Sequence, residues 1–353
     1  MKKIFTIAFI LACFGPAAFA SYSSALHAVQ KGDYATALLE LEEPLASEDA
    51  KAQYLMAYMY YHGLGVARDY KKAFDLFEAS SDQGNIEALT FVAYMYDEGK
   101  GVAINKKKAF DLYQVASEEG DITATMNLGV LFYQGNGVPQ NYEKAFELLS
   151  SIENVRHPII QYYLGNFHFY GYGVPKDAQK AFPYYVKSAQ YGSVEAHYLL
   201  GHLYQNGIGT QGDSSLAMQY YEYAAMMNFP QAQFNLATMY ADGANGSVDK
   251  VMAYAWLSKA VENGVDGAKK ALSDLSDSMS MGDISTAKKR IMELDKAMIN
   301  PNLRSPAGVA ADVAEALGMP VSVDGDVAQG GGSSAASQRP KRTQRSKRMV
   351  RRR

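Results

Sequence analysis

Histidine and carboxylate side chains are the groups of this chain that could hold a metal or transfer protons. No histidine pair is four residues apart and no His-Glu-x-x-His motif occurs, so no pattern places two ligands on one helix face. His197 and His202 are five residues apart, and the adjacent carboxylates Glu42 and Glu43 diverge on a helix. The six histidines are His27, His62, His157, His168, His197 and His202. We therefore predict no catalytic residue, no metal site and no cofactor.

Short glycine motifs are the other candidate for chemistry, because glycine-rich loops bind phosphates. Gly63-Leu64-Gly65 and its copies lack the lysine of a phosphate loop, and the chain has no nucleophile elbow and no dinucleotide fingerprint. The copies occur at a fixed distance along the chain, which favours a structural role. We interpret them as turns between helices.

The chain repeats with a constant period of 36 residues. One glycine and one alanine recur at this spacing without an insertion: Gly63, Gly99, Gly135, Gly171, Gly207 and Gly243, and Ala73, Ala109, Ala145, Ala181, Ala217 and Ala253. A third series holds only residues that cap helix N-termini: Asp33, Asp69, Asn105, Asn141, Asp177, Asp213, Asp249 and Ser285. A repeat of this length predicts stacked units rather than separate globular domains.

Each unit is predicted to form two helices, A and B. In the first unit, Asp49 begins helix A and Gly63 ends it in the left-handed conformation, whereas Asp69 begins helix B and Gly84 ends it. Prolines at 158 and 230 fall at the start of later A helices, where a missing amide costs little. Pro183 lies inside a B helix, where we expect a local kink or shift.

One unit shows the whole consensus: Leu128-Gly129, Phe132, Gly135, Gly137-Val138, Asn141 and Lys144-Ala145. This pattern resembles the Sel1-like repeats, which are relatives of the tetratricopeptide repeat. The resemblance implies an all-α fold, a right-handed α-solenoid of stacked helix-turn-helix repeats. It also implies an adaptor rather than an enzyme, with a protein or peptide partner.

The register and the composition divide the chain. We predict a signal peptide at 1–20, capping helices of a partial repeat at 21–48, a degenerate capping repeat at 265–299 and a tail at 300–353. The six predicted units lie between the caps, at 49–84, 85–120, 121–156, 157–192, 193–228 and 229–264.

The first twenty residues predict export. Two lysines, an apolar run and the small-x-small sequence that ends at Ala20 are typical of a signal peptide. Cleavage after Ala20 would leave no cysteine and no transmembrane segment, and would place the protein in the periplasm or outside the cell. The alternative is a lipoprotein acylated at Cys13, but Leu11 fits that motif poorly. We favour cleavage after Ala20.

Binding residues are expected on the A helices, which would line the concave side of the solenoid. Two variable columns of these helices mix aromatic and polar side chains, a composition suited to an extended peptide or a sugar surface. Several of these residues could instead cover their neighbours. The candidates are Tyr58, Tyr61, Tyr94, Asp97, Tyr133, Asn166, Phe169, Tyr170, His202 and Gln205.

The tail carries a short predicted helix at 306–317 and a basic cluster at 339–353. The cluster has nine cations and no acidic residue, so we expect it to bind anions. Its targets could be envelope lipids, acidic polymers, or acidic proteins including the chain's own solenoid. Nucleic acid is disfavoured, because no aromatic residue is interleaved with the charges. The cations are Arg339, Lys341, Arg342, Arg345, Lys347, Arg348, Arg351, Arg352 and Arg353.

The overall charge of −3 hides two parts of opposite sign. Removing the two lysines of residues 1–20 and the nine cations of 339–353 leaves −14 on residues 21–338. The sequence thus predicts a non-enzymatic, exported, acidic scaffold with a basic tail. The alternatives are an enzyme or regulator that acts on the cell wall or a polysaccharide, and a secreted effector that contacts a host.

Overall fold

The computed structural model describes residues 15–244 and 246–299, and all regular structure in these ranges is helical. The predicted helix at 306–317 and the basic cluster at 339–353 lie outside the described residues, as does most of the predicted signal peptide. The helices are α1 (Gly15–Gln30), α2 (Tyr34–Ala46), α3 (Ala50–His62), α4 (Tyr70–Asp82), α5 (Ile86–Glu98), α6 (Lys106–Glu118), α7 (Ile122–Gln134), α8 (Tyr142–Ser151), α9 (Pro158–Tyr170), α10 (Ala178–Gln190), α11 (Val194–Asn206), α12 (Ser214–Met226), α13 (Pro230–Asp242), α14 (Lys250–Glu262), α15 (Ala268–Ser276) and α16 (Met281–Ile299).

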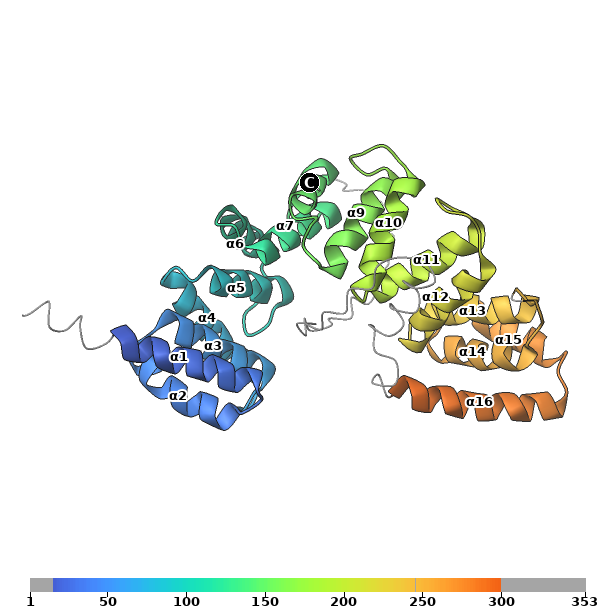
Figure 1. Ribbon diagram of the computed structural model, residues 1–353, viewed down its shortest axis with the longest axis horizontal. Helices are drawn as coiled ribbons and strands as arrows, with labels where there is room; N and C mark the ends of the chain where they lie inside the picture. The colour runs from blue at the N-terminus through green and yellow to red at the C-terminus, as the bar shows by residue number, and fades with distance from the viewer. Residues whose placement is uncertain (1–14, 245, 300–353) are drawn as a thin grey trace, which may run out of the picture.

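The helices form an all-α solenoid. Antiparallel pairs follow one another along an arch, with α1 and α2 at one foot and α16 at the other (Figure 1). The A helices are α3, α5, α7, α9, α11 and α13, and the B helices are the even-numbered helices from α4 to α14. Since each helix packs mainly on its neighbours in sequence, the buried hydrophobic residues are spread along the arch in three clusters rather than gathered in one centre.

Side-chain caps set the start of most helices. The side chains of Asp33, Asp69, Asn105, Asn141, Asp177, Asp213 and Asp249 accept hydrogen bonds from the backbone amides two or three residues ahead. Ser285, the eighth member of the predicted series, is not a cap, because it lies inside α16. There, Ser280 and Asp283 bond each other's amides and hydroxyl instead, so α16 begins five residues before the register predicts.

In the first five units, two glycines of the turn between helices A and B have separate roles. Gly63 ends α3 with a φ of 73°, in the left-handed region. Gly101, after α5, also has positive φ, and a Cβ atom there would lie 2.2 Å from the backbone oxygen of Tyr70 in the preceding unit. The first glycine therefore ends helix A, and the second lets successive units approach each other.

A glycine or another residue with positive φ also follows most B helices. Gly84, Gly120, Gly192 and Gly264 hold this position, and Glu48 and Asn228 adopt the same conformation at φ of 56° and 60°. The corresponding residue of the third unit, Arg156, is absent from this set. There α8 ends at Ser151 and is three residues shorter than its 13-residue counterpart α10.

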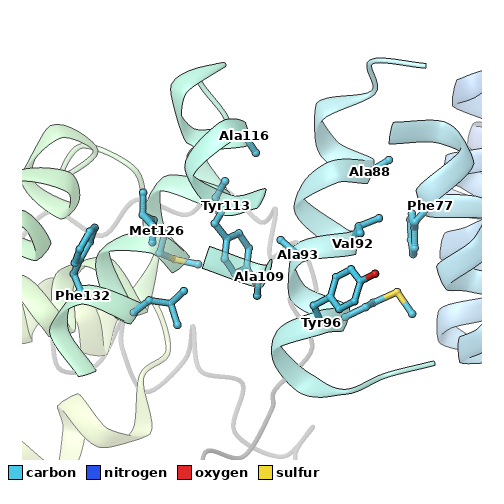
Figure 2. Packing of buried hydrophobic residues seen from close by; sticks show 14 of the residues in the cluster. Phe77, Ala88, Val92, Ala93, Tyr96, Ala109, Tyr113, Ala116, Met126 and Phe132 are labelled. Atoms are coloured by element: carbon cyan, nitrogen blue, oxygen red, sulfur yellow. The ribbon is translucent and has the colours of Figure 1, made fainter. Parts of the chain in front are cut away.

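Small residues on the A helices face large residues on the B helices. A Cβ atom at Gly201 would lie 2.6 Å from the ring of Tyr221, and one at Gly165 would lie 2.7 Å from Tyr185. Alanine replaces this glycine elsewhere, and Figure 2 shows Ala93 beside Tyr113. The small column is Ala57, Ala93, Gly129, Gly165, Gly201 and Ala237, and the large column is Phe77, Tyr113, Leu149, Tyr185, Tyr221 and Leu257. These pairs fix the distance between the two helices of a unit.

The prolines differ in their effect. Pro158 and Pro230 are the first residues of α9 and α13, as predicted. Pro183 is exposed inside α10, which still runs unbroken over 13 residues. The proline therefore does not shorten the helix.

Candidate functional site

One face of each A helix is open to solvent. We define the A-helix face by three columns that begin at Lys51, Tyr58 and His62 and repeat every 36 residues; the three starting positions lie on one side of α3. The first and last columns are exposed in all six units, whereas the middle column is partly buried in most of them. The last column is His62, Glu98, Gln134, Tyr170, Asn206 and Asp242. Because neither its size nor its charge is constant, this column does not serve the packing of the units.

The predicted binding residues divide by burial. Tyr170 and Gln205 are exposed, whereas Tyr58, Tyr94 and His202 are partly buried. Gln205 Oε1 accepts a 2.9 Å hydrogen bond from the Tyr221 hydroxyl. These five residues are available on the surface, at least in part.

Two predicted binding residues belong to the core instead. Asn166 is buried, and its Oδ1 accepts a 2.8 Å hydrogen bond from the hydroxyl of buried Tyr185. Tyr61 is also buried. Their assignment to the binding surface was wrong, because the sequence does not show that a large or polar side chain opposite will cover them.

Lys100 joins two of the predicted tyrosines. Its ammonium donates hydrogen bonds to the hydroxyls of Tyr61 at 2.8 Å and Tyr94 at 2.9 Å, and lies 4.9 Å from the centre of the Tyr94 ring. Burial disfavours the charged ammonium, but these two acceptors raise the pKa of Lys100 above its ordinary value. Burial raises the pKa of Tyr61 to about 12, against the effect of Lys100. The ammonium of Lys100 is thus a cation held by two tyrosine hydroxyls.

Asp97 forms an ion pair within its own unit. Its carboxylate lies 2.7 Å from the ammonium of Lys106, and both side chains are largely covered. Asp97 is therefore engaged in a structural contact, whereas the sequence placed it among the binding candidates.

Tyr133 and Phe169 lie among other aromatic rings. The Tyr133 ring is 4.7 Å from that of Tyr163 and 5.3 Å from that of Tyr142. Burial raises the pKa of Tyr133 above its ordinary value. Phe169 packs edge-on against Tyr170 at 4.9 Å. Both candidates are partly buried, so they contribute to packing as well as to the surface.

A stack of three tyrosines crosses from the third unit to the fourth. Tyr142 and Tyr172 are stacked with ring centres 4.4 Å apart, and Tyr172 is stacked on Tyr170 at 5.2 Å. Tyr170 is 47% exposed, so the stack reaches the surface. The sequence pattern did not reveal Tyr142, which belongs to a B helix. It also missed most of the last column, although the register that revealed the turns runs through it.

The histidines do not assemble a metal site. His197 is buried, its Nδ1 lies 2.7 Å from the Ser193 carbonyl oxygen, and its ring stacks on Tyr223 at 3.8 Å. Within residues 15–244 and 246–299, no three histidine, cysteine or carboxylate side chains lie together as metal ligands would.

A shallow groove of about 670 Å³ crosses the start of α3, α5 and α7. It is lined by helix termini, including Asn85 and Asp121, and by Lys51, Glu87 and Glu119. Asn85 and Asp121 already cap their own helices. The groove therefore contains charges of both signs, and the side chains of Asn85 and Asp121 are already hydrogen-bonded to their own helices.

The sequence of these units matches one family model. The Sel1 repeat model matches residues 50–85, 86–121, 122–151, 159–193, 194–229 and 230–265. The chain belongs to the Sel1 repeat family. The matched segments leave out residues 152–158, where α8 ends early. Among curated proteins, no sequence match was found.

Two solved structures have the same solenoid. A Sel1 repeat protein from Oxalobacter formigenes is 27% identical with a TM-score of 0.62, and the match covers 68% of this chain and 96% of that protein. A protective antigen of uropathogenic Escherichia coli, which has an SLR fold, is 21% identical with a TM-score of 0.63. That match covers 86% of this chain and 66% of the antigen, and shows the fold alone.

Sel1-repeat proteins generally mediate protein–protein interactions and act as non-catalytic scaffolds. Among the helices that the structure describes, none is both long and apolar enough to cross a bilayer. The family therefore directs the functional question to the exposed faces of the units.

Proposed function

We propose that this protein is a non-enzymatic, exported scaffold that holds a protein segment along the A-helix face. The observation that carries the proposal is the last column of that face, which is exposed in all six units and holds a different residue in each. The stacking positions behave in the opposite way, since Ala57, Ala73 and their equivalents are small and buried throughout. A surface that is open in every unit and free to vary suits an extended partner that contacts several units.

The binding test uses side chains that are exposed or partly buried. Replacing Tyr58, Tyr170 and Asn206 by alanine removes three side chains from the A-helix face, and none of the three is fully buried. Immobilised wild-type protein is expected to capture specific envelope proteins, identified by mass spectrometry, and the triple variant to lose them. The helical circular dichroism of the variant should be unchanged.

The control variant carries the same number of alanine substitutions, but at exposed positions of the B helices. Asp75, Val115 and Lys187 are exposed on α4, α6 and α10, and their triple alanine variant should retain the captured proteins. Equal capture by the A-helix variant and the wild-type protein would rule out the A-helix face as the binding surface.

A glycan is the second candidate ligand, and the tyrosine stack supports it. Sugar rings pack on aromatic faces, and Tyr170 presents a partly exposed ring at the end of the stack formed with Tyr172 and Tyr142. Purified envelope polysaccharide should then bind the wild-type protein and not Tyr170→Ala. If the A-helix variant loses protein capture and the wild-type protein does not bind the polysaccharide, the ligand is a protein.

Export is part of the proposal and has a separate test. The proposed cleavage after Ala20 falls within α1, and would leave a helix that starts at Ser21. Amino-terminal sequencing of the protein from a periplasmic fraction should give Ser21, whereas an acylated Cys13 would indicate the lipoprotein. Recovery of the uncleaved chain from the cytoplasm would contradict both.

A further inference from the structure

The C-terminal half of the solenoid includes a long segment without positive charge. Between Lys187 and Lys250 the sequence contains no lysine and no arginine. This segment forms α11, α12 and α13. Glu195 and Asp242 are exposed there, at the two ends of the A-helix face. The face of these units therefore attracts cations and has none of its own.

The charge of Glu195 acts on tyrosines of the neighbouring A helix. It adds to the rise in the pKa of Tyr162 and of Tyr163 on α9, whose rings pack edge-on with centres 5.5 Å apart. Tyr170, at the end of the same helix, is stacked on Tyr172 at 5.2 Å. Burial raises the pKa of Tyr162 to about 12, and the charge of Glu195 adds to this rise. Tyr162, Tyr163 and Tyr170 thus stay neutral, and their rings and hydroxyl oxygens can accept a cation.

The N-terminal half shows how this surface holds a cation. There, Tyr61 and Tyr94 bind the chain's own Lys100 through both hydroxyl oxygens. The equivalent of Lys100 in the fourth unit is Tyr172, and in the fifth it is Ile208. The residues that correspond to Tyr61 and Tyr94 beside Ile208 are Phe169 and His202, so this two-phenol site is not repeated there. The C-terminal half has tyrosines in other columns and no lysine between Lys187 and Lys250, so a cation over these rings has to come from elsewhere.

The chain carries a segment of complementary charge. Residues 339–353 contain nine cations and no acidic residue. The last described helix, α16, ends on the side of its foot that faces the opposite foot of the arch (Figure 1). The 40 residues from Ile299 to Arg339 span at most about 130 Å, whereas the four helices between α11 and α16 correspond to roughly 50 Å at the usual packing distance. The segment is long enough to reach the face of its own molecule.

We propose that residues 339–353 dock in cis on the A-helix face of α9, α11 and α13, with their cations over the tyrosines and near Glu195. The inference rests on the proposed function, because it takes the same face as the binding surface. The tail then acts as a built-in competitor that a partner has to displace.

Carbodiimide cross-linking of the full-length protein tests the contact directly. This reagent joins a carboxylate to an amine only when the two touch, and the tail offers Lys341 and Lys347. Peptide mapping of the monomer is expected to show links from these lysines to Glu195 or Asp242. The links should disappear at about 0.5 M salt, which screens exposed charges over a few ångströms. No link, links spread evenly over carboxylates outside residues 188–249, or links confined to a dimer would overturn docking in cis.

An affinity measurement uses a labelled synthetic peptide of residues 339–353. Its binding is compared between the wild-type protein and a neutralised chain, the full-length protein in which all nine basic residues of the tail are replaced by glutamine. Its face is free, so it should bind the peptide roughly tenfold more tightly than the wild type does. Equal binding by the two proteins would overturn the proposal.

A matched pair of charge variants locates the peptide. Glu195→Gln in the neutralised chain should weaken peptide binding roughly threefold to tenfold. Glu87→Gln should leave it unchanged, because Glu87 has the same place in the second unit and is equally exposed. Equal losses in the two variants would overturn the assignment to the C-terminal half.

The two proposals fail in different ways. If the neutralised chain and the wild type capture partners equally while the A-helix variant captures none, the scaffold proposal stands and the tail inference fails. If the A-helix variant still captures partners, the scaffold proposal fails, and the cross-links decide the tail contact alone.

Discussion

The residue that follows each B helix shows how a single backbone angle selects a residue type. Four units use glycine at this position, but Glu48 and Asn228 adopt the left-handed conformation without being glycine. Asn228 has compensating bonds, since its Oδ1 accepts hydrogen bonds from Gln233 and Asn263. Glu48 has an exposed side chain, and only its backbone carbonyl accepts a bond, from Gln83. Side-chain hydrogen bonds therefore offset the left-handed backbone conformation at Asn228 but not at Glu48.

Glu48→Gly is expected to raise the free energy of unfolding by about 0.5–1 kcal/mol, because glycine adopts positive φ without the Cβ clash. The gain can be measured by thermal or urea unfolding. Glu48→Ala is the control, since it removes the same carboxylate but keeps a Cβ atom. Equal gains from the two variants would attribute the effect to charge rather than to backbone strain.

His197 is the buried histidine whose protonation opposes folding. Burial between Tyr223 and the Ser193 carbonyl lowers its pKa to about 4, from an ordinary value near 6.5. Between these two pH values the unfolded chain binds a proton that the folded chain does not. The contribution of His197 is therefore complete above pH 6.5 and is lost as the pH falls toward 4.

The predicted loss for His197 is on the order of 3 kcal/mol across that interval. Denaturant unfolding from pH 7 to pH 4 should show it, together with the contributions of other groups. His197→Phe keeps the ring stack and should reduce the pH dependence, whereas His27→Phe at an exposed site on α1 should not. An unchanged pH dependence in His197→Phe would contradict the assignment.

At the scale of the elements, the contact between helices A and B depends on one small residue and one large one. In the fifth unit Gly201 faces Tyr221, and in the sixth Ala237 and Leu257 hold the same two positions. In the fifth unit a Cβ atom on the small residue would lie 2.6 Å from the ring, so there the glycine leaves room for it. The two pairs are alternative solutions for the same spacing.

Gly201→Ala should destabilise the protein by about 1–3 kcal/mol, since the new methyl group would lie within 3 Å of the Tyr221 ring. Adding Tyr221→Leu recreates the pair of the sixth unit, so the two changes should cost less together than the sum of their separate effects. A double-mutant cycle by urea unfolding measures this coupling. Gly282→Ala, in an uncrowded part of α16, should cost nothing. Additive effects would show that the ring does not set the spacing.

At the scale of the whole molecule, the third and fourth units are joined differently from the others. Helix α8 ends at Ser151, and residues 152–157 form a non-helical connection without the usual glycine. Glu153 ties this connection to the fourth unit, because its carbonyl accepts a 2.6 Å hydrogen bond from Gln161 and its carboxylate a 3.3 Å bond from Tyr184. Fewer helical hydrogen bonds protect this joint.

Hydrogen exchange should reveal the joint. The amides of residues 152–157 are expected to exchange at least about tenfold faster than those of residues 188–193, which hold the same place in the next unit. Mass spectrometry of peptic peptides from the native protein gives both rates. Equal protection of the two segments would show that the shortened helix does not weaken the solenoid.

The sequence by itself determined the architecture. Local rules fix helix starts and ends, so the spacing of the cap residues and of glycines such as Gly63 was enough to predict helices, turns and stacking. The rule failed at Ser285, where a different cap, Ser280, began the last helix. The Sel1 resemblance, drawn from the same residues, is confirmed by the family match.

Only the tertiary structure decided which side chains are available to a partner. Asn166 and Tyr61 occupy the predicted columns, but Tyr185 and Lys100 cover or engage them from other helices and turns. Burial depends on the size of residues about 20 to 40 positions away, and this information is not contained in the local pattern. For the same reason, the local pattern does not predict the stack of Tyr142, Tyr172 and Tyr170, because only packing brings these rings together.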